Sequence, residues 1–371
     1  MIVFAVAAAY FLLLSWSNLL WLRLSARKPR RGYGGRISVL IPCRNEADNI
    51  GRCLESLVAQ SYGNYEIVVL DDLSTDGTWE IIRDYAERYP EVVTAVPGKA
   101  LPRSGWYGKP HAMQQLAEHA GGQYLLFTDA DTEHGPDSLA WAVAKLERHR
   151  ADCLSGYVYQ RIGSFGEMLI VPVTYLMSAL FLPLWLIPTA GPPALSFAIG
   201  QFIMFRARVF EAIGGYAAVA ERISDDMFVA REVKRAGFRL VFLDLRRQVS
   251  CRMYRGYREA YEGIAKNIFD FFRWRPLFFA VASSALVLFV VLPLLVLPLQ
   301  LAAGDPTARY TAAGVCLFFL AWAFTLYDRG LPWWAPFLYP LQFVHILLMA
   351  WKSFGLANSG RGVVWKGRVV R

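Results

Sequence analysis

Charged residues are scarce in this chain of 371 residues: Asp, Glu, Lys and Arg make up 19% of it, below the roughly 25% that is typical of soluble domains. Hydrophobic residues make up 55%, which excludes a disordered or collagen-like chain. The charges are missing from whole blocks, namely residues 2–21, 277–303, 310–327 and 331–351, the last with His345 as its only ionisable residue. A helix needs about 20 apolar residues to cross a bilayer. The sequence therefore predicts an integral membrane protein.

Cysteine is also scarce, and no two cysteines form a CxxC pair. The five are Cys43, Cys53, Cys153, Cys251 and Cys316. This spacing argues against a zinc site and against a disulfide framework. We expect free, buried thiols in a reducing compartment. His111, His119 and His134 show no metal-ligand spacing, and we expect them at the surface.

Acidic residues are absent from residues 23–36, which contain six Arg and Lys. A basic run directly after an apolar block follows the positive-inside rule and suits anionic lipids, so we expect no nucleic-acid partner in spite of the net charge of +9. The first block lacks the basic start and the small-residue cleavage site of a signal peptide. We expect residues 1–22 to be a retained transmembrane anchor with its N-terminus outside, in a multi-pass plasma-membrane protein whose catalytic domain is cytoplasmic.

Strand and helix patterns alternate from residue 36 to about residue 163. Short apolar runs, typical of buried parallel strands, occur at residues 37–41, 66–70, 92–96 and 124–128. Helical patterns lie between them, at residues 50–58, 78–89 and 109–120. This alternation predicts an α/β fold with a doubly wound, mostly parallel, Rossmann-like sheet, which binds ligands at the carboxyl ends of its strands.

Two of the expected strands end in acidic residues. Asp71 and Asp72 follow the second strand, and Asp129 and Asp131 follow the fourth. Carboxylates at positions i and i+2 can hold a hard divalent cation that takes phosphate oxygens as further ligands. The alternative is that these acids only cap the helices that follow them.

Four motifs, in order, resemble glycosyltransferase family 2, whose members have the GT-A fold. They are Pro42 to Glu46, the DDxSxDGT turn from Asp71 to Thr78, the DxD from Asp129 to Asp131, and GGYAAVAERISDDMFVAREVKRAGF at residues 214–238. The resemblance covers roughly residues 36–274. The chain departs from the family at Leu73, where Gly is commonest, and at Asp225-Asp226, where Glu-Asp is the commoner pair.

The resemblance implies a UDP-sugar donor and Mg²⁺ or Mn²⁺ as the cofactor. The residues it assigns to the donor are Pro42, Glu46, Asp71, Asp72 and Asp129. Asp131, together with Asp129, is assigned to the metal ion on the diphosphate. A cation there offsets the negative charge that develops on the leaving group.

The acidic pair downstream is assigned to catalysis by the same resemblance. Asp226 is the candidate general base, which takes a proton from the acceptor hydroxyl as it attacks, and Asp225 is the second candidate. The alternative is helix N-capping, which Ser224 or Asp225 could provide alone.

Two further segments resemble lipid-directed and polymer-forming members. GWYGKPHAMQQ, residues 105–115, is similar to the GWxGK segment of enzymes acting on lipids, which implies that Lys109 meets the diphosphate as a point charge; the alternative is a solvated lysine at a helix start. Arg273 and Trp274 match the end of the (Q/R)xxRW motif and could contact the diphosphate and acceptor. Its first position is Asp270, which weakens processive synthesis, and anchoring at the headgroups is the alternative role.

The apolar segment at residues 168–190 lies between the DxD and Asp226, which must share one pocket. A single crossing would separate them, so we expect an interfacial or re-entrant segment within a cytoplasmic GT-A domain at residues 23–276. A buried helix of the soluble core is the alternative. We expect transmembrane helices at residues 277–352 and a basic cytoplasmic tail at 353–371, although three crossings there would place the tail outside.

The sequence thus predicts an inverting glycosyltransferase that moves a hexose, with UDP-glucose as the favoured donor, to a membrane lipid. Within the family its layout resembles ceramide glucosyltransferases and the carotenoid- and hopanoid-associated enzymes of bacteria, which implies a carotenoid, hopanoid or sphingolipid-like acceptor. A polysaccharide synthase is the first alternative, and a membrane scaffold without catalytic activity is the second.

Overall fold

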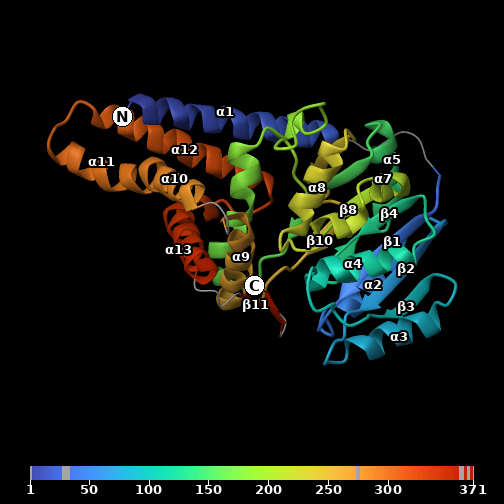
Figure 1. The fold of residues 1–371 in the computed structure, drawn as a ribbon. Helices are drawn as coiled ribbons and strands as arrows, with labels where there is room; N and C mark the ends of the chain where they lie inside the picture. The colour runs from blue at the N-terminus through green and yellow to red at the C-terminus, as the bar shows by residue number, and fades with distance from the viewer. Residues whose placement is uncertain (1, 27–33, 273–275, 359–362, 366–367, 371) are drawn as a thin grey trace. The chain divides into compact units, whose positions relative to one another are not determined.

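The computed structural model describes residues 2–26, 34–272, 276–358, 363–365 and 368–370 (Figure 1). The chain divides into two compact units. The α/β unit contains Arg23–Arg161 and Leu186–Met253, and the apolar unit contains Met1–Leu22, Ile162–Trp185 and Tyr254–Arg371.

The α/β unit is built on a seven-stranded sheet with the strand order β3-β2-β1-β4-β8-β6-β9. Only β8 runs antiparallel to its neighbours, so the sheet is mostly parallel, as predicted. Its strands are β1 (Ile37–Cys43), β2 (Tyr65–Asp71), β3 (Val93–Pro97), β4 (Tyr124–Phe127), β6 (Cys153–Tyr157), β8 (Ile203–Arg206) and β9 (Leu240–Asp244). The first four confirm the expected strands to within two residues at each end.

The helices of this unit follow from their apolar stripes. Helix α2 buries Ile50, Cys53, Leu54 and Leu57, which are residues of the expected i, i+3, i+4, i+7 stripe. Figure 1 shows α4 along β1 and β2, against which it packs. The helices are α2 (Ile50–Val58), α3 (Thr78–Arg88), α4 (Gly108–Glu118), α5 (Ser138–Arg148), α7 (Ala207–Ala212) and α8 (Asp225–Arg235).

A second sheet of three short strands has the order β5-β10-β7. Its strands are β5 (Thr132–His134), β10 (Val249–Cys251) and β7 (Tyr159–Gln160). Strands of two or three residues are too short to show a hydrophobic period, so the sequence did not predict this sheet. It begins directly after the DxD turn, because β5 starts at Thr132.

The expected surface placement is wrong for two of the three histidines. His134 is 6% exposed and His111 is 9% exposed, whereas His119 is exposed. The ring nitrogens of His134 lie 3.1 and 3.2 Å from the hydroxyls of Thr128 and Thr132 and 3.3 Å from that of Ser138. The His134 ring can be buried because these three hydroxyl groups satisfy its nitrogens. Thr132 belongs to β5, the strand that the sequence did not predict. All five cysteines are free; four are buried as expected, and Cys316 is exposed.

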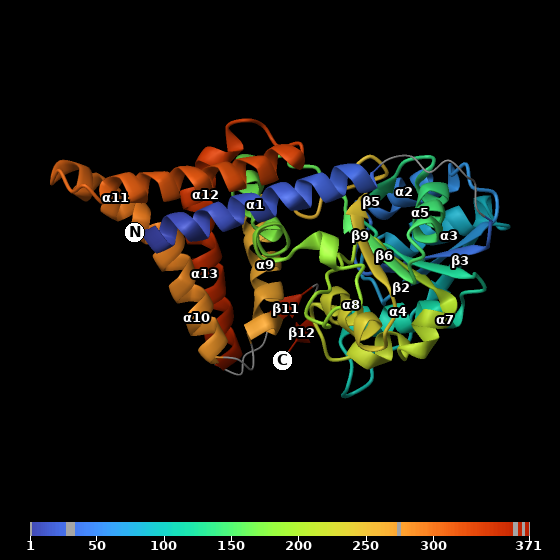
Figure 2. The same ribbon diagram turned by 90° about the horizontal axis from the view of Figure 1, so that it is seen from above.

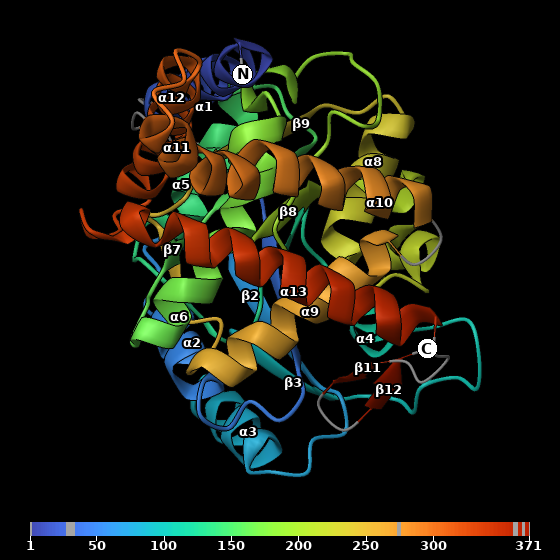
Figure 3. The same ribbon diagram turned by 90° about the vertical axis from the view of Figure 1, so that its left-hand side faces the viewer.

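The apolar unit contains long helices that pack side by side. Figure 1 shows α1 beside α12, Figure 2 shows α10 beside α13, and Figure 3 shows α9 beside α13. Gly314 of α12 allows the Phe4 ring of α1 to lie against the helix backbone, in space that a Cβ would fill. The helices are α1 (Ile2–Ser25), α6 (Phe165–Ile170), α9 (Tyr257–Phe272), α10 (Pro276–Leu286), α11 (Leu292–Ala302), α12 (Ala308–Asp328) and α13 (Tyr339–Asn358), followed by the hairpin of β11 (Val363–Trp365) and β12 (Arg368–Val370).

Within the described residues, three helices are long and apolar enough to cross a membrane: Ile2–Ser25, Phe279–Ala302 and Ala308–Asp328. They correspond to the first three apolar blocks of the sequence. The fourth block contains a short turn at Ala335–Leu338 followed by α13, and it is not among these spans.

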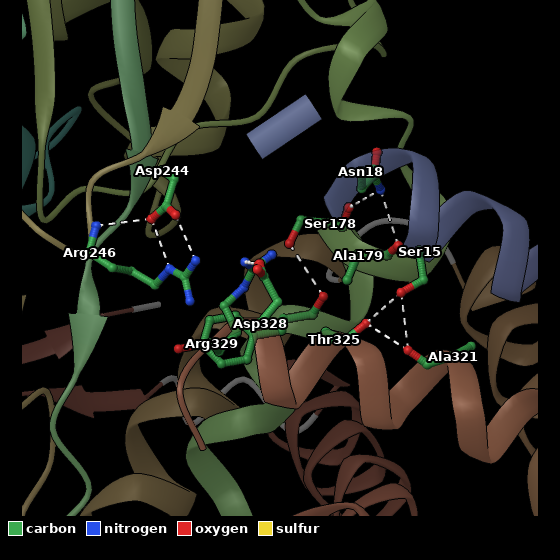
Figure 4. A network of polar contacts seen from close by, with 11 residues as sticks. Ser15, Asn18, Ser178, Ala179, Asp244, Arg246, Ala321, Thr325, Asp328 and Arg329 are labelled. Carbon is green, nitrogen blue, oxygen red and sulfur yellow. Dashed lines mark hydrogen bonds and ion pairs between the residues drawn. The ribbon is translucent and has the colours of Figure 1, made fainter. Parts of the chain in front are cut away.

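The expected interfacial segment, residues 168–190, is broken into short pieces. Its residues up to Trp185 belong to the apolar unit, and those from Leu186 belong to the α/β unit. Its pieces include α6, a 3₁₀ turn at Val171–Tyr175, a π-helical turn at Met177–Phe181 and a 3₁₀ turn at Leu184–Leu186. The side chain of Asn18 in α1 forms hydrogen bonds with backbone groups near the end of this segment, between Ser178 and Leu184. As Figure 4 shows, Nδ2 of Asn18 faces Ser178 and Ala179; it donates to their carbonyls and, at 2.9 Å, to that of Leu182, while Oδ1 accepts from the N–H of Leu184 at 2.8 Å.

Candidate active site

The DxD turn leaves the carboxyl end of β4 and enters β5 rather than a helix. The next helix, α5, begins only at Ser138. The alternative that Asp129 and Asp131 cap a following helix is therefore wrong. Their carboxylates lie at the edge of the sheet where parallel α/β folds bind their ligands.

Lys109, Asp129 and Asp226 converge on the backbone of Gly200. Nζ of Lys109, in the first turn of α4, donates to Oδ1 of Asp129 at 2.6 Å. The N–H of Gly200 donates to Oδ2 of Asp226 at 2.9 Å. A Cβ at Gly200 would lie 3.1 Å from Nζ of Lys109, 3.6 Å from Oδ2 of Asp226 and 3.8 Å from Oδ2 of Asp129. Lys109 is thus ion-paired within a charged cluster, and its side chain keeps 38% of its surface exposed.

The acidic pair begins α8, and its two members differ in access. Asp226 is partly exposed, with its Oδ1 accepting from the N–H of Met227 at 2.8 Å, whereas Asp225 is only 4% exposed. Among the described residues, Oδ2 of Asp225 has no hydrogen-bond partner. Ser224 makes no side-chain capping bond to the helix, which removes that form of the capping alternative. Both carboxylates lie at the positive end of the helix dipole.

The electrostatics of the cluster follow from three carboxylates around one ammonium. Burial raises the pKa of the Asp225 carboxyl to about 7, opposed by the Lys109 ammonium and assisted by the charges of Asp226 and Asp129. Burial also raises the pKa of Asp226, against Lys109 and the N–H groups of Gly200 and Met227. Burial lowers the pKa of the Lys109 ammonium, but the charges of Asp129 and Asp225 outweigh burial and raise the pKa above the ordinary value. A base with a raised pKa is suited to proton transfer near neutral pH.

Asp131 directly precedes β5 of the small sheet. Its charge acts on the buried thiol of Cys251 in β10, where burial is the main cause that raises the pKa well above the ordinary value. Its charge and that of Asp129 also act on Cys53 of α2, where burial is the main cause that raises the pKa to about 12. The turn is therefore supported by buried, neutral thiols.

The donor set of the DxD fits a hard divalent cation such as Mg²⁺ or Mn²⁺. Asp129 and Asp131 offer two carboxylates. In the part of the chain that the structure describes, no group of three or more His, Cys, Asp or Glu side chains could hold a metal ion by itself. Mg²⁺ is commonly bound through one or two carboxylates, with waters and substrate phosphates completing its shell. The two aspartates match that pattern.

The first two motifs form a braced pair of loops. The N–H groups of Asn45, Glu46 and Ala47 donate to Ser74 Oγ, Thr78 Oγ1 and Asp76 Oδ2 at 2.9, 2.8 and 3.2 Å. Ser74, Asp76 and Thr78 thus satisfy the backbone of the preceding motif, and half of the DDxSxDGT turn has a structural role.

These hydrogen bonds hold together the two loops that carry the candidate donor-site residues after β1 and β2. Pro42 and Cys43 pair with Leu70 and Asp71 in the sheet register, so Pro42 and Asp71 lie at the carboxyl edge. Asp71 and Asp72 are buried, at 8% and 4% exposure, and Oδ2 of Asp71 accepts from the N–H of Ser74 rather than from a helix. Oε2 of Glu46 accepts from Asn49 at 2.8 Å.

Leu73, the departure from the family pattern, has a φ of 56°. A residue without a Cβ adopts this left-handed conformation at no steric cost, which explains why Gly is commonest there. Arg273 and Trp274 lie outside the described residues.

Several residues of the site carry no motif and were not predicted. Gly200 is the first, and its only signal is a glycine after an apolar run. Gly98 is the second: a Cβ there would lie 2.6 Å from the carbonyl oxygen of Asp71. Cys251 and Gln201, which donates to its sulfur, have no signal in the sequence, because Cys251 comes next to Thr132 of the DxD turn only through the small sheet.

Comparison with known proteins gives a family and a fold. The family profile "Glycosyl transferase family 2" matches residues 38–214. EpsE of Bacillus subtilis (strain 168), a protein assigned as a glycosyltransferase, is 30% identical over 186 residues, which is 50% of this chain and 62% of that protein. The 4,4'-diaponeurosporenoate glycosyltransferase of Staphylococcus aureus is 37% identical over 95 residues, 26% of this chain and 24% of that enzyme. The match thus spans less than two thirds of either relative.

Among solved structures, the mannosyltransferase PcManGT from Pyrobaculum calidifontis, in complex with GDP-Man and Mn²⁺, has a TM-score of 0.56 and 21% sequence identity. The likeness covers 95% of this chain and 98% of that one. At this identity it establishes the fold: a GT-A-like α/β domain with apolar helices at both ends of the chain.

Proposed function

This chain belongs to glycosyltransferase family 2, and on that basis we propose that it transfers a hexose from a nucleotide sugar to a membrane lipid with inversion at the anomeric carbon. The observation that carries the proposal is the cluster of Lys109, Asp129 and Asp226 around Gly200. A general base, a cation-binding carboxylate and a diphosphate-binding ammonium are the groups this reaction needs.

The acceptor hydroxyl attacks the anomeric carbon of the donor while the bond from that carbon to the diphosphate oxygen breaks. Asp226 takes the hydroxyl proton, and the nucleoside diphosphate leaves with the electron pair of the broken bond. The partial exposure of Asp226 and the raised pKa of its carboxyl support its role as the general base. Attack opposite to the leaving group on an α-linked donor yields a β-glycoside.

Lys109, Asp129 and Asp131 are proposed to receive the diphosphate. Asp131 and Asp129 would hold Mg²⁺ or Mn²⁺, which when bound neutralises charge on the leaving group. Lys109 adds a second positive charge from the first turn of α4. Pro42, Glu46, Asp71 and Asp72 are proposed to line the nucleotide at the braced loops, and we favour UDP-glucose as the donor.

The acceptor is proposed to be a membrane lipid such as a carotenoid, hopanoid or sphingolipid-like molecule. Supporting this class are three helices with the length and composition of membrane spans and the similarity of 95 residues to a carotenoid glycosyltransferase. With these three crossings and the N-terminus outside, residues 23–276 and the basic tail at 353–371 lie in the cytoplasm, in agreement with the positive-inside rule.

Transfer of label from UDP-glucose to lipid tests the proposal. Membranes that contain the full chain are incubated with UDP-[¹⁴C]glucose and Mn²⁺ and then extracted with organic solvent. We expect label in the organic phase, its loss in Asp226→Asn, and normal labelling in Asp84→Asn, which removes an exposed carboxylate of α3. Label in an insoluble polymer would favour the polysaccharide synthase, and no label with UDP- or GDP-hexoses would favour the scaffold.

A further inference from the structure

The 3₁₀ turn at Gly215–Val219 precedes α8 and contacts the three elements that position the charged cluster. These elements are α4 with Lys109, β4, which ends shortly before Asp129, and α8 with Asp226. We propose that Gln114 of α4 is a positioning residue, which holds the Asp226 carboxylate in place relative to Lys109 by fixing this turn. The inference rests on the proposed function, because Asp226 is the general base in it.

Gln114 caps the turn with its side chain. Oε1 of Gln114 accepts from the N–H of Tyr216 at 2.9 Å and from that of Ala217 at 3.3 Å. The first N–H groups of a helical turn have no partner within it, and Gly214, which precedes this turn, offers no side-chain capping bond. The Gln114 carboxamide therefore satisfies the start of the turn. Because both bonds go to backbone groups of the turn, the effect of Gln114 on Asp226 passes through the turn.

The glycine at position 215 allows the Gln114 carboxamide to come this close. Gly215 has a φ of 58°, and a Cβ there would lie 2.6 Å from Oε1 of Gln114. Any other residue would displace the carboxamide and would also be strained in this left-handed conformation. The N–H groups at the start of the turn are thus open to Gln114 because residue 215 has no side chain.

A second hydrogen bond joins the other end of the turn to the start of α4. The N–H of Tyr107, directly before α4, donates to the carbonyl of Ala220, directly after the turn, at 2.7 Å. Between these two ties, the buried ring of Tyr216 lies against Phe127 of β4, with the ring centroids 4.9 Å apart. The turn is therefore held against α4 at both of its ends and against β4 through Tyr216.

These contacts determine where α8 begins relative to α4. Asp226 lies in the first turn of α8 and Lys109 in the first turn of α4, and both side chains converge on Gly200. A misplacement of about 1 Å can cost about 100-fold in rate. Loss of the Gln114 bonds would free one end of the turn. It should therefore misplace the base without removing a group that contacts the substrate.

Transfer of label from UDP-[¹⁴C]glucose to lipid, in membranes that contain the full chain, tests the proposal. Gln114→Met keeps the length of the side chain without its oxygen, and we expect it to lower the maximal rate about 10-fold or more. Gln114→Glu keeps an accepting oxygen and should stay close to the wild type. Affinity for UDP, measured by calorimetry in detergent, should be unchanged in both variants, because the nucleotide is proposed to lie at the braced loops.

Gln115→Met is the matched control on the same helix. Oε1 of Gln115 accepts from the N–H of Lys99 at 2.8 Å, and its side chain is buried. It thus ties α4 to a loop that carries none of the three charged groups. This change should lower Tm but leave the maximal rate near that of the wild type. An equal fall in rate for Gln114→Met and Gln115→Met would overturn the inference, because a general disturbance of α4 would then be responsible.

A double-mutant cycle with Asp226→Asn distinguishes positioning of the base from a separate effect. Gln114→Met should cause little further loss of rate in Asp226→Asn, since the base that it positions is already absent. The full loss in both backgrounds would show that Gln114 acts independently of Asp226 and would overturn the inference. If Gln114→Met does not fold, Gln114→Asn withdraws the oxygen by one methylene and takes its place, with the same expected fall.

An unchanged maximal rate in both Gln114→Met and Gln114→Asn would overturn the inference and leave the proposed function intact. An equal fall in Gln114→Glu and Gln114→Met would also overturn it, because the accepting oxygen would then not be responsible. A wild-type chain that transfers no label from UDP- or GDP-hexoses would remove the proposed function and the inference with it.

Discussion

At the scale of single residues, the acidic pair divides into one accessible and one buried carboxylate. Asp226 is partly exposed and accepts from Gly200, whereas Asp225 is buried beside it. The sequence alone offered both as catalytic candidates. Because Asp226 is the more exposed of the two, we assign it as the group that contacts the acceptor. Asp225 then acts on Asp226 through its charge.

We expect Asp226→Asn to reduce turnover by about 100-fold or more, the usual scale for removing a general base. An amide keeps the shape of the side chain but cannot accept the proton. Affinity for UDP, measured by calorimetry on the full chain in detergent, should stay close to that of the wild type. Loss of UDP binding with turnover of the bound donor intact would contradict the assignment.

Gly200→Ala should impair the site without unfolding the protein. The new methyl group would lie 3.1 Å from Nζ of Lys109 and would press the ammonium away from Asp129. We expect kcat/KM to fall about 10-fold or more, because small displacements of reacting groups are costly. Gly63→Ala is the control, since nothing lies within 4 Å of its added methyl group; equal effects of the two changes would count against the cluster.

Asp225 should make stability depend on pH. Its folded pKa of about 7 lies above that of an unfolded Asp, about 3.9, so the native state retains a proton that the unfolded state releases. The stability this group contributes is present below the unfolded pKa and is lost as pH rises through about 7.

Asp225→Asn cannot lose this proton, so its advantage in Tm over the wild type should grow from pH 5 to pH 8 and then level off. Thermal unfolding of the detergent-solubilised chain measures it, with the exposed Asp84→Asn as control. A difference in Tm that is the same at both pH values would show that Asp225 does not titrate in this range.

At the scale of elements, the broken segment after residue 162 depends on the helix α1 beside it. Prolines at 172, 183 and 188 prevent a continuous helix, because each removes a backbone donor. The carbonyls released in this way need partners in an apolar environment. Ala179, four residues before Pro183, has such a carbonyl, and the Asn18 amide donates to it and to the neighbouring carbonyls of Ser178 and Leu182.

We expect Asn18→Leu to destabilise the chain by about 1–3 kcal/mol, the cost of leaving buried polar groups unsatisfied. The carbonyls at Ser178, Ala179 and Leu182 and the N–H of Leu184 would all lose a partner. Thermal unfolding in detergent should show a lower Tm than for Tyr10→Leu, which changes an exposed residue of the same helix. Similar Tm values for the two variants would mean that the segment is held without Asn18.

At the scale of the whole molecule, residues 162–185 should return the chain to the side of the membrane from which it came, because the chain belongs to the α/β unit before and after them. The chain leaves the α/β unit at Arg161 and re-enters it at Leu186, and the site residues of that unit, Asp131 and Asp226, must act on one substrate. We therefore propose that residues 168–190 lie in the cytoplasmic face of the membrane without crossing it.

Cysteines placed at the exposed residues Arg161 and Ala194 test this topology. The four buried cysteines can stay, and Cys316→Ala removes the exposed one. An impermeant maleimide should label both positions from the same side of inverted vesicles. Labelling from opposite sides would exclude the re-entrant path and with it the proposed route of the lipid acceptor.

The sequence by itself determined the features that depend on local pattern. Four strands, three helices and the apolar spans follow from hydrophobic periodicity over windows of five residues or more. The DxD, the acidic pair and Lys109 were identifiable because the family motifs are contiguous in the chain.

Only the tertiary structure decided the features that depend on residues far apart in sequence. Gly200 becomes part of the site because α4, β4 and α8 bring Lys109, Asp129 and Asp226 to its backbone. Cys251 pairs with Thr132, directly after the DxD, through strands of two or three residues, which are too short to show a period. His134 is buried because hydroxyls from three positions satisfy its ring. In each case the side chain's environment is assembled by packing, and the spacing of residues along the chain carries no signal of it.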